Sequence, residues 1–227
     1  MLTISGSNMN TRTNSLQVAI FNRSNDKLKS REVSEFRKKL FVDYLGWNLN
    51  CNGHGEVDQF DTEQTLYAAL YSDDQLIGSF RAIRSDQPYL AEIVFPALAT
   101  TRTYPKRTDV WEISRFGVLT EGNSKFASDI LYATMFHFAL MRRAKALVAV
   151  TDLYHERHLT RLGIRTRRYG VPLQYGLDAR GRPIFVVGGE IPVDAQDASN
   201  LRNLLSNLNG VSLNDQTLVF GRSRIQA

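Results

Sequence analysis

The sequence is poor in cysteine, which limits how the fold can be held together. Its 227 residues include one cysteine, Cys51, so no disulfide can form within the chain and no multi-cysteine metal site is possible. Such a composition suits a reducing compartment. Cys51 also lacks a partner histidine at any recognisable spacing, so we do not expect this thiol to act as a nucleophile.

Long apolar runs are also missing. Residues 1–20 are mostly polar, and no segment approaches the length of a membrane span, so we expect a cytoplasmic protein without membrane insertion. Neither sign of charge dominates, because 28 lysines and arginines face 23 acidic residues, giving a net charge of +5. An excess this small indicates an acidic partner only where the positive charges cluster.

The apolar pattern predicts a single α/β domain. Hydrophobic residues make up 43% of the chain, enough for one sizeable core. Apolar residues return to one face between residues 29 and 47, which predicts an amphipathic helix ending near Gly46. Residues 48–64 are expected to form a long loop. Two β-favouring runs in residues 65–86, on either side of Ser72 to Asp74, predict a hairpin.

The second half of the chain predicts a partly parallel sheet. Residues 109–119 and 146–151 have the pattern of strands, and residues 124–144 that of a long helix with Asn123 or Ser124 as its N-cap. A strand, a helix and a second strand in this order require a parallel crossover.

The C-terminal third predicts further helices and strands. Asp152 can cap a short helix that ends at Gly163, and two strands are expected around the turn from Asp178 to Gly181. Residues 195–208 predict a closing helix.

We expect one domain over residues 1–227. Its core should cover about residues 17–208, with the N-terminal dozen residues and the tail after Leu208 loosely held. The order of elements favours a sheet with helices on both faces.

Charged residues occur where the pattern predicts buried strands. The stretch VWEISRFGV contains Glu112 and Arg115, and a preceding strand supplies Arg81. Because side chains alternate along a strand, Glu112 and Ser114 should share one face and Arg115 should point to the other. An unpaired buried charge is costly, so we expect Arg81 and Arg115 to meet carboxylates from the long loop.

Three carboxylates of that loop are the candidate partners, namely Glu56, Asp58 and Asp61. The residues alone leave two interpretations open. The cluster can be a structural ion-pair network that pins the loop to the sheet. It can also be a polar pocket for a zwitterionic ligand, with carboxylates for its cations, an arginine for its carboxylate and a base for its amine.

The order of these residues resembles that of the acyl-homoserine-lactone synthases, the LuxI-type autoinducer synthases of bacterial quorum sensing. Their pattern is an arginine, a phenylalanine and a tryptophan, then a Glu-x-Asp-x-x-Asp run, an arginine after a glycine-containing strand, and a Glu-x-x-Arg-Phe strand. The matching positions are Arg37, Phe41, Trp47, Glu56, Asp58, Asp61, Arg81, Glu112 and Arg115. So many ordered positions are more specific than one short motif, and the resemblance covers roughly residues 17–190.

The resemblance implies a fold and a reaction. The fold is a three-layer αβα sandwich with a mixed, twisted sheet splayed into a V-shaped cleft, as in the GCN5-related N-acetyltransferases. In the reaction, an acyl thioester acylates the α-amine of S-adenosylmethionine, whose carboxylate then attacks its own γ-carbon. The products are N-acyl-homoserine lactone and methylthioadenosine. S-adenosylmethionine is a substrate, so no cofactor and no metal are implied.

The resemblance also implies roles for single residues. Catalytic roles are expected for Glu112, Arg115, Asp58 and Asp61. Substrate contacts are expected for Arg37, Phe41, Trp47, Glu56, Arg81, Ser114 and Thr151. Glu112 is the candidate base, since burial at a cleft raises the proton affinity of a carboxylate. Trp47 can meet the sulfonium through a cation–π contact, although packing in a helix core is the structural alternative. Thr151 should point into the cleft where the acyl chain runs.

The expected acyl donor is an acyl-acyl carrier protein, with acyl-CoA as the second possibility. Acyl-CoA-dependent N-acetyltransferases hold the CoA pyrophosphate with a glycine-rich turn before the long helix, but here residues 119–125, LTEGNSK, contain one glycine and a glutamate. Carrier proteins are acidic, so a basic patch should receive them. Its candidates, which ordinary solvated charge would explain equally well, are Arg142, Arg143, Lys145, Arg165, Arg167 and Arg168.

Two other functions stay open. An acyl-CoA-dependent N-acyltransferase acting on another amine would release no methylthioadenosine. A nucleic-acid-binding module would explain the positive charge, but acids near a phosphate site would repel the ligand, so no nucleic acid is expected as a partner. His155 and His158, three residues apart, are expected to face solvent rather than to share a metal.

Overall fold

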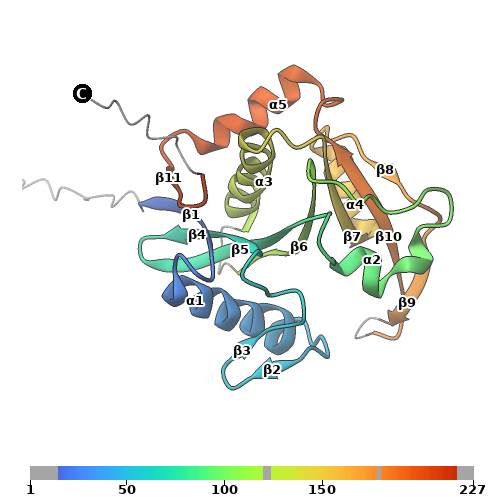
Figure 1. Cartoon of the computed structure of the whole chain (residues 1–227), viewed down its shortest axis with the longest axis horizontal. Helices are drawn as coiled ribbons and strands as arrows, with labels where there is room; N and C mark the ends of the chain where they lie inside the picture. Colours follow the sequence, from blue (N-terminus) through green and yellow to red (C-terminus); the bar gives the residue numbers. More distant parts are fainter. Residues whose placement is uncertain (1–14, 120–123, 178–179, 219–227) are drawn as a thin grey trace, which may run out of the picture.

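A mixed sheet runs through the molecule and carries helices on both faces (Figure 1). The computed structural model describes residues 15–119, 124–177 and 180–218. The strands of the main sheet are β1 (Leu16–Asn22), β4 (Leu66–Ser72), β5 (Gln75–Arg84), β6 (Val110–Val118), β7 (Ala146–Asp152), β8 (Arg167–Arg168), β9 (Leu173–Leu177), β10 (Pro183–Pro192) and β11 (Ser212–Asp215). Their order is β11-β1-β4-β5-β6-β7-β10-β8, with β9 paired to β10. A small hairpin of β2 (Cys51–Asn52) and β3 (Gly55–Glu56) lies in the loop that was expected to be irregular.

The helices divide between the two faces of the sheet, which confirms the predicted three-layer α/β architecture. They are α1 (Lys27–Arg37), its π-helical continuation η1 (Lys38–Tyr44), α2 (Leu90–Val94), the short η2 (Pro96–Leu98), α3 (Ser124–Met141), α4 (Leu153–Arg161), α5 (Ala198–Leu205) and η3 (Ser206–Leu208). Apolar residues of α1, η1 and α2 pack on one face of the sheet, and those of α3, α4 and α5 pack on the other.

Local sequence signals account for the ends of the helices. The Asp26 carboxylate accepts a hydrogen bond from the Lys29 backbone N–H and so caps α1. The predicted stop is confirmed, because Gly46 follows η1 with a φ of +71° that favours glycine. Asp152 caps α4 as predicted by accepting the His155 N–H. Asn123, one candidate cap of α3, lies outside the described residues, and Ser124 is the first helical residue.

The predicted strand pairings are confirmed. β4 and β5 form an antiparallel hairpin, and β6 and β7 are parallel neighbours joined through α3. β9 and β10 pair antiparallel on either side of the predicted turn, of which residues 178–179 lie outside the described part.

The parallel pairing of β6 with β7 is short. It comprises Val110 with Ala146, Trp111 with Leu147 and Glu112 with Val148. Beyond this point β6 continues along β5 and β7 continues along β10, and the two strands diverge in Figure 1. Two strand edges therefore face each other without pairing in the described residues, which is the splay implied by the resemblance. We call this gap the wedge and the Glu112–Val148 pair its apex.

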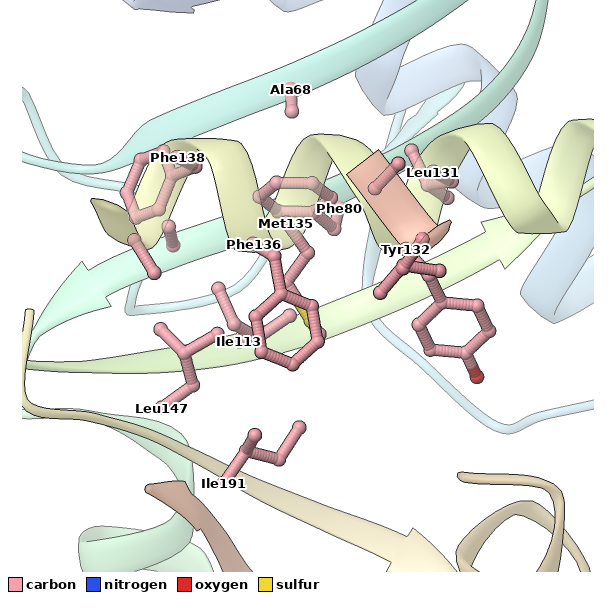
Figure 2. Packing of buried hydrophobic residues seen from close by; sticks show 14 of the residues in the cluster. Ala68, Phe80, Ile113, Leu131, Tyr132, Met135, Phe136, Phe138, Leu147 and Ile191 are labelled. Carbon is pink, nitrogen blue, oxygen red and sulfur yellow. The ribbon is translucent and has the colours of Figure 1, made fainter. Parts of the chain in front are cut away.

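The largest part of the core lies between the sheet and α3 (Figure 2). Phe138 of α3 contacts Phe80 of β5 and Trp111 of β6 edge to face, with ring centroids 6.0 and 5.2 Å apart. Such aromatic pairs contribute beyond the apolar area they bury. They hold α3 against β5 and against β6, one of the two strands that border the wedge.

The expected end of the core near residue 208 is wrong. Residues 212–215 form β11, which pairs parallel with β1. Arg142 explains why this strand is held, because its guanidinium lies 4.0 Å from the Phe138 ring centroid and donates to Asp215 at 2.9 and 3.2 Å. A short polar strand gives no periodic signal, so its tertiary partner decides its structure.

Helix α2 was also missed, within a stretch expected to be irregular. It has five residues, fewer than two helical turns, and Tyr89 offers no side-chain cap. A periodicity cannot be recognised over so few residues.

In the described part of the chain, no helix combines the length and the apolar character needed to cross a bilayer.

Replacing Arg142 should destabilise the fold. Arg142→Ala leaves Asp215, whose side chain is 4% exposed, buried without its cation. We expect the free energy of unfolding in urea to fall by about 3 kcal/mol. Lys145→Ala is the control, since this side chain is 61% exposed, and should change it by less than about 0.5 kcal/mol. Equal stabilities of the two variants would show that the Arg142–Asp215 pair does not hold β11.

Candidate active site

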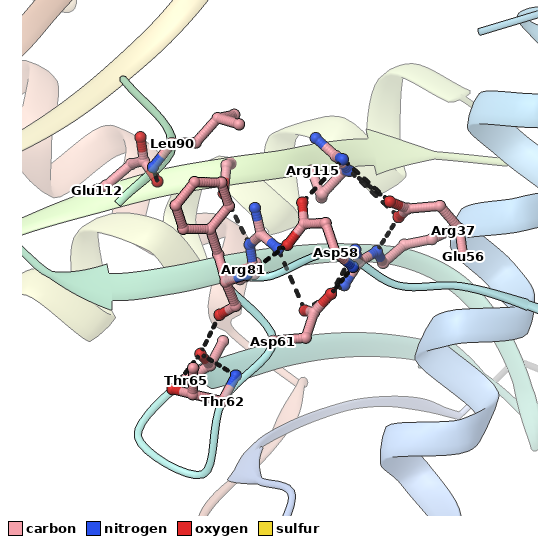
Figure 3. Close-up of polar contacts among 12 residues, drawn as sticks. Arg37, Glu56, Asp58, Asp61, Thr62, Thr65, Arg81, Leu90, Glu112 and Arg115 are labelled. Carbon is pink, nitrogen blue, oxygen red and sulfur yellow. Dashed lines mark hydrogen bonds and ion pairs between the residues drawn. The ribbon is translucent and has the colours of Figure 1, made fainter. Parts of the chain in front are cut away.

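The predicted loop carboxylates and strand arginines meet in one ion-pair network on the α1 face of the sheet (Figure 3). Arg37, at the end of α1, donates to Glu56 Oε2 at 2.5 Å and to both oxygens of Asp61 at 2.7 and 3.0 Å. Its side chain is buried. α1 is therefore bonded directly to the acidic loop.

Arg81 of β5 forms the centre of the network. It donates to Asp58 Oδ1 at 2.5 Å, to Asp61 Oδ1 at 3.2 Å and to Ser114 Oγ of β6 at 3.0 Å. Its Nη2 is buried and has no hydrogen-bond partner among the described residues. Such an unpaired buried donor is costly in a folded protein.

The charges of the network stabilise one another. Burial alone would raise the pKa of Asp61, but the hydrogen bonds and charge of Arg37 and the charge of Arg81 outweigh it and hold this pKa well below its usual range. Glu56 is shifted in the same direction, burial again being opposed by Arg115 and Arg37. These carboxylates are therefore ionised at neutral pH.

Arg115 reaches the network through a β-bulge, which corrects the expectation that it points away from Glu112 and Ser114. Its φ is +51°, and the pairing of β6 with β5 shifts register at this residue. A bulge adds one residue and resets the alternation of side chains. Arg115 therefore joins Glu56 and Asp58, both at 3.0 Å, while Phe116 turns to the α3 face.

Glu112 lies at the apex of the wedge and is 1% exposed. Its two oxygens accept the backbone N–H groups of Leu90 at 3.0 Å and Ala91 at 2.6 Å, the first residues of α2. Burial raises the pKa of Glu112 to about 7, against the opposing effects of these donors and of Arg81. Sequence reasoning had no means to find Leu90 and Ala91, because they act through their backbone.

The two aromatic residues of the signature form a stacked pair beside the network. The ring centroids of Phe41 and Trp47 lie 5.0 Å apart. Phe41 is buried, but Trp47 is 47% exposed. η1 approaches β6 so closely that a Cβ at Gly117 would lie 2.5 Å from Leu40 Cδ2. About half of the Trp47 side chain therefore remains accessible beside the network.

The remaining predicted substrate residue, Thr151, lies on β7 beyond the apex. Its side chain lies on the same face of β7 as that of Leu147, which packs on the α3 side. Thr151 is half-buried. Thr151 therefore borders the wedge on the α3 face of the sheet, whereas the charged network lies on the α1 face.

The predicted carrier patch does not form a single cluster at the wedge. The prediction for Arg142 is wrong, because its side chain is 8% exposed and forms an ion pair with Asp215. Arg143 and Lys145 are exposed but precede β7, whereas the wedge opens toward the end of this strand. The other three members, which are also exposed, are Arg165, Arg167 and Arg168; the last forms an ion pair with Glu156 of α4.

His155 and His158 do not simply face solvent, as was expected. The Tyr132 hydroxyl is hydrogen-bonded to His155 Nε2, and both imidazoles lie against the Tyr132 ring. No group of three metal-ligating side chains occurs within the described ranges. Cys51 is exposed.

The fold and the site together define an acyltransferase. Its main features are two strands that part beside a buried carboxyl group and the charged network on the α1 face. The chain belongs to the autoinducer synthase family, the acyl-homoserine-lactone synthases, whose profile matches residues 20–196.

Relatives and solved structures agree with this assignment. The acyl-homoserine-lactone synthase of Acinetobacter nosocomialis is 34% identical over 152 residues, 63% of this chain and 83% of that protein. A probable acyl-homoserine-lactone synthase of Sinorhizobium fredii is 31% identical over 180 residues, 76% of this chain and 84% of the relative. The crystal structure of TofI with an inhibitor and MTA has a TM-score of 0.69 and 28% identity, covering 82% of this chain and 96% of TofI. BjaI, a CoA-dependent acyl-homoserine lactone synthase, shares the fold with a TM-score of 0.78 at 19% identity, covering 90% and 96% of the two chains.

The pKa of Glu112 should be visible in the pH dependence of stability. Its value in the folded protein, about 7, lies above its ordinary value of 4.5, so the folded state binds the proton more tightly and loses stability as pH rises through this window. Relative to Glu112→Gln, the wild type should lose roughly 3 kcal/mol of unfolding free energy between pH 4.5 and 7. Urea titrations across this range measure the difference, and parallel pH curves would contradict the raised pKa.

Proposed function

We propose that the protein makes N-acyl-L-homoserine lactone from S-adenosylmethionine and an acyl thioester, releasing methylthioadenosine, and so supplies a quorum-sensing signal. The observation that carries the proposal is Glu112, a buried carboxyl group with a pKa of about 7 at the apex of the wedge. A base whose pKa lies near the working pH is suited to take a proton from an amine.

The wedge is suited to the thioester donor. Residues 113–118 of β6 and 149–152 of β7 lack a partner strand on the sides that face each other in the described structure. Backbone N–H and C=O groups on such edges can bind the amides of an extended pantetheine arm, as they bind an added strand. CoA and acyl carrier protein share this arm.

In the first step, the α-amine of S-adenosylmethionine attacks the thioester carbonyl. The C–N bond forms, the C–S bond of the thioester breaks, and the thiolate leaves. Glu112 accepts the proton that the amine loses, directly or through water. The free Nη2 of Arg81 is the group that would hold the substrate carboxylate and so orient the amine.

In the second step, the carboxylate oxygen attacks the γ-carbon of the same substrate. A C–O bond closes the lactone ring while the bond from this carbon to the sulfonium breaks, and methylthioadenosine leaves as a neutral thioether. Trp47 is placed to stack on the sulfonium or the adenine. Asp58 and Asp61 attract the positive sulfonium. Arg37, itself paired with Glu56, holds Asp61 in position, and Arg81 and Arg115 hold Asp58.

The donor that we propose is an acyl-acyl carrier protein. α4 begins where β7 ends and carries Arg157 and Arg161, both exposed. Arg168 of β8 forms an ion pair with Glu156 of α4, so the two α4 arginines form with Arg167 and Arg168 one exposed basic surface beside β10, which an acidic carrier protein would complement. Arg165 is hydrogen-bonded to Gln196 and Lys145 pairs with Asp194, so both lie toward the start of β7 with Arg143 and are not part of the proposed surface. The reaction requires no cofactor besides its substrates, and both substrates are cytoplasmic compounds, so we propose a cytoplasmic location.

Product analysis tests the function. Purified protein given S-adenosylmethionine and an acyl thioester should release methylthioadenosine and a base-labile lactone in equal amounts, both detected by mass spectrometry. Release of the thiol without methylthioadenosine would instead identify an N-acyltransferase that uses another amine. Glu112→Gln should reduce kcat at least 100-fold, and unchanged turnover would remove Glu112 from the role of base.

The same assay distinguishes the donors. We expect kcat/KM to be at least tenfold higher with an acyl-carrier-protein donor than with the matching acyl-CoA. Arg161→Glu should raise KM more for the carrier protein than for acyl-CoA, because the carrier protein presents the larger acidic surface. Equal effects on both donors would reject the surface but not the reaction.

Trp47 should contribute to binding rather than to folding. Trp47→Leu removes the half-exposed indole and should raise KM for S-adenosylmethionine about tenfold, the equivalent of about 1.4 kcal/mol of stacking or cation–π energy. Tyr44→Leu is a matched control, because Tyr44 is an aromatic residue of η1 that is 77% exposed. Identical KM values for the two variants would show that the indole does not contact the substrate.

A further inference from the structure

A cluster of rings closes the wedge on its α3 side. Phe116, turned to this face by the bulge, packs on Tyr132 with ring centroids 4.6 Å apart. The Tyr132 ring lies 5.9 Å from His155, which is also 6.0 Å from Phe116. These side chains come from β6, α3 and α4, the elements that border the wedge beyond its apex. Neither the charged network nor the proposed chemistry uses them.

Tyr132 is the boundary between this cluster and the closed core. It is 2% exposed, and Leu131, Met135 and Phe136 on the same helix are 0 to 3% exposed. Figure 2 shows Tyr132 at the margin of the core with its hydroxyl directed away from the neighbouring apolar side chains. A close-packed core does not open for an added chain without cost. On this side, the Tyr132 ring therefore separates the wedge from the closed core.

His155 keeps the Tyr132 ring in this position. The phenol and the imidazole are hydrogen-bonded to each other, and both are largely withdrawn from solvent. Burial lowers the pKa of His155, with His158 adding to this effect and Asp152 opposing it, so the imidazole is neutral at pH 7. Breaking the bond would leave two polar groups unpaired, which restricts rotation of the tyrosine away from the wedge.

We propose that Tyr132, held by His155, is the steric end of the acyl compartment, so that the protein selects thioesters of short straight-chain acyl groups. The inference rests on the proposed function, because it requires a thioester between β6 and β7. From the apex, an acyl chain on the α3 side passes Phe116 and Thr151 and then reaches the Tyr132 ring. A longer chain would have to displace this ring from its contacts with Phe116 and His155.

The test is a donor series measured by methylthioadenosine release. Wild-type protein is given butanoyl, octanoyl and dodecanoyl thioesters of one carrier, and we expect kcat/KM at least tenfold higher for butanoyl than for dodecanoyl. Tyr132→Ala removes the ring and should change this ratio at least tenfold in favour of dodecanoyl. Tyr132→Phe keeps the ring but removes its hydrogen bond to His155, so it should change the ratio less than Tyr132→Ala does. His155→Leu should shift the ratio in the same direction as Tyr132→Ala, by a smaller factor.

The outcomes separate this inference from the function on which it rests. Wild-type protein that uses dodecanoyl and butanoyl donors equally overturns the inference alone, as does a folded Tyr132→Ala variant with the wild-type ratio. If Tyr132→Ala does not fold, as circular dichroism would show, the wild-type series and His155→Leu still decide. No methylthioadenosine from any donor overturns the proposed function and the inference with it.

Discussion

The left-handed backbone of Arg115 is the constraint on which the site depends. Without the bulge, strict alternation would place Arg115 on the α3 face, where a guanidinium would lie among aromatic rings. With it, the arginine reaches Glu56 and Asp58, and Phe116 takes the apolar position. A non-glycine residue at positive φ costs about 1 kcal/mol or more. The two ion pairs and the packing of Phe116 offset this cost, so one strained residue determines the character of both faces of β6.

The charged network is as much a scaffold as a site. Three buried arginines are matched by three carboxylates, and they join α1, the acidic loop, β5 and β6. Buried pairs of this kind seldom add much net stability compared with apolar packing, but losing one partner is strongly destabilising. The structural interpretation of the sequence and the functional one are therefore compatible. The network fixes the loop, and it leaves Nη2 of Arg81 buried without a hydrogen-bond partner among the described residues.

The sequence predicted most of the elements and the meeting of charges, and it failed where long-range contacts decide. Elements with strong apolar periodicity or clear turn and cap residues are all present. They are the amphipathic helices α1 and α3, the hairpin of β4 and β5, and the parallel strands β6 and β7. The loop carboxylates could be matched to Arg81 and Arg115 because buried charges need partners. The face of Arg115 could not be predicted, because a bulge depends on the register between two strands. Three other contacts could not be predicted either, because the residue types do not indicate which partners they meet in the fold. These are the hydrogen bonds from the α2 amides to Glu112, the Tyr132–His155 bond and the Arg142–Asp215 pair.

The edge of the sheet has a consequence for how the molecule folds. β1 and β11 are the first and last strands of the described chain, yet they are hydrogen-bonded neighbours, and Arg142 at the end of α3 links to the same strand through Asp215. Contacts between such distant segments carry a large loop-closure entropy and form late. During synthesis, the ribosome must therefore release nearly the whole chain before this edge can close. Until then β1 presents an open side to other nascent chains, and a protein truncated before Asp215 would keep that vulnerability.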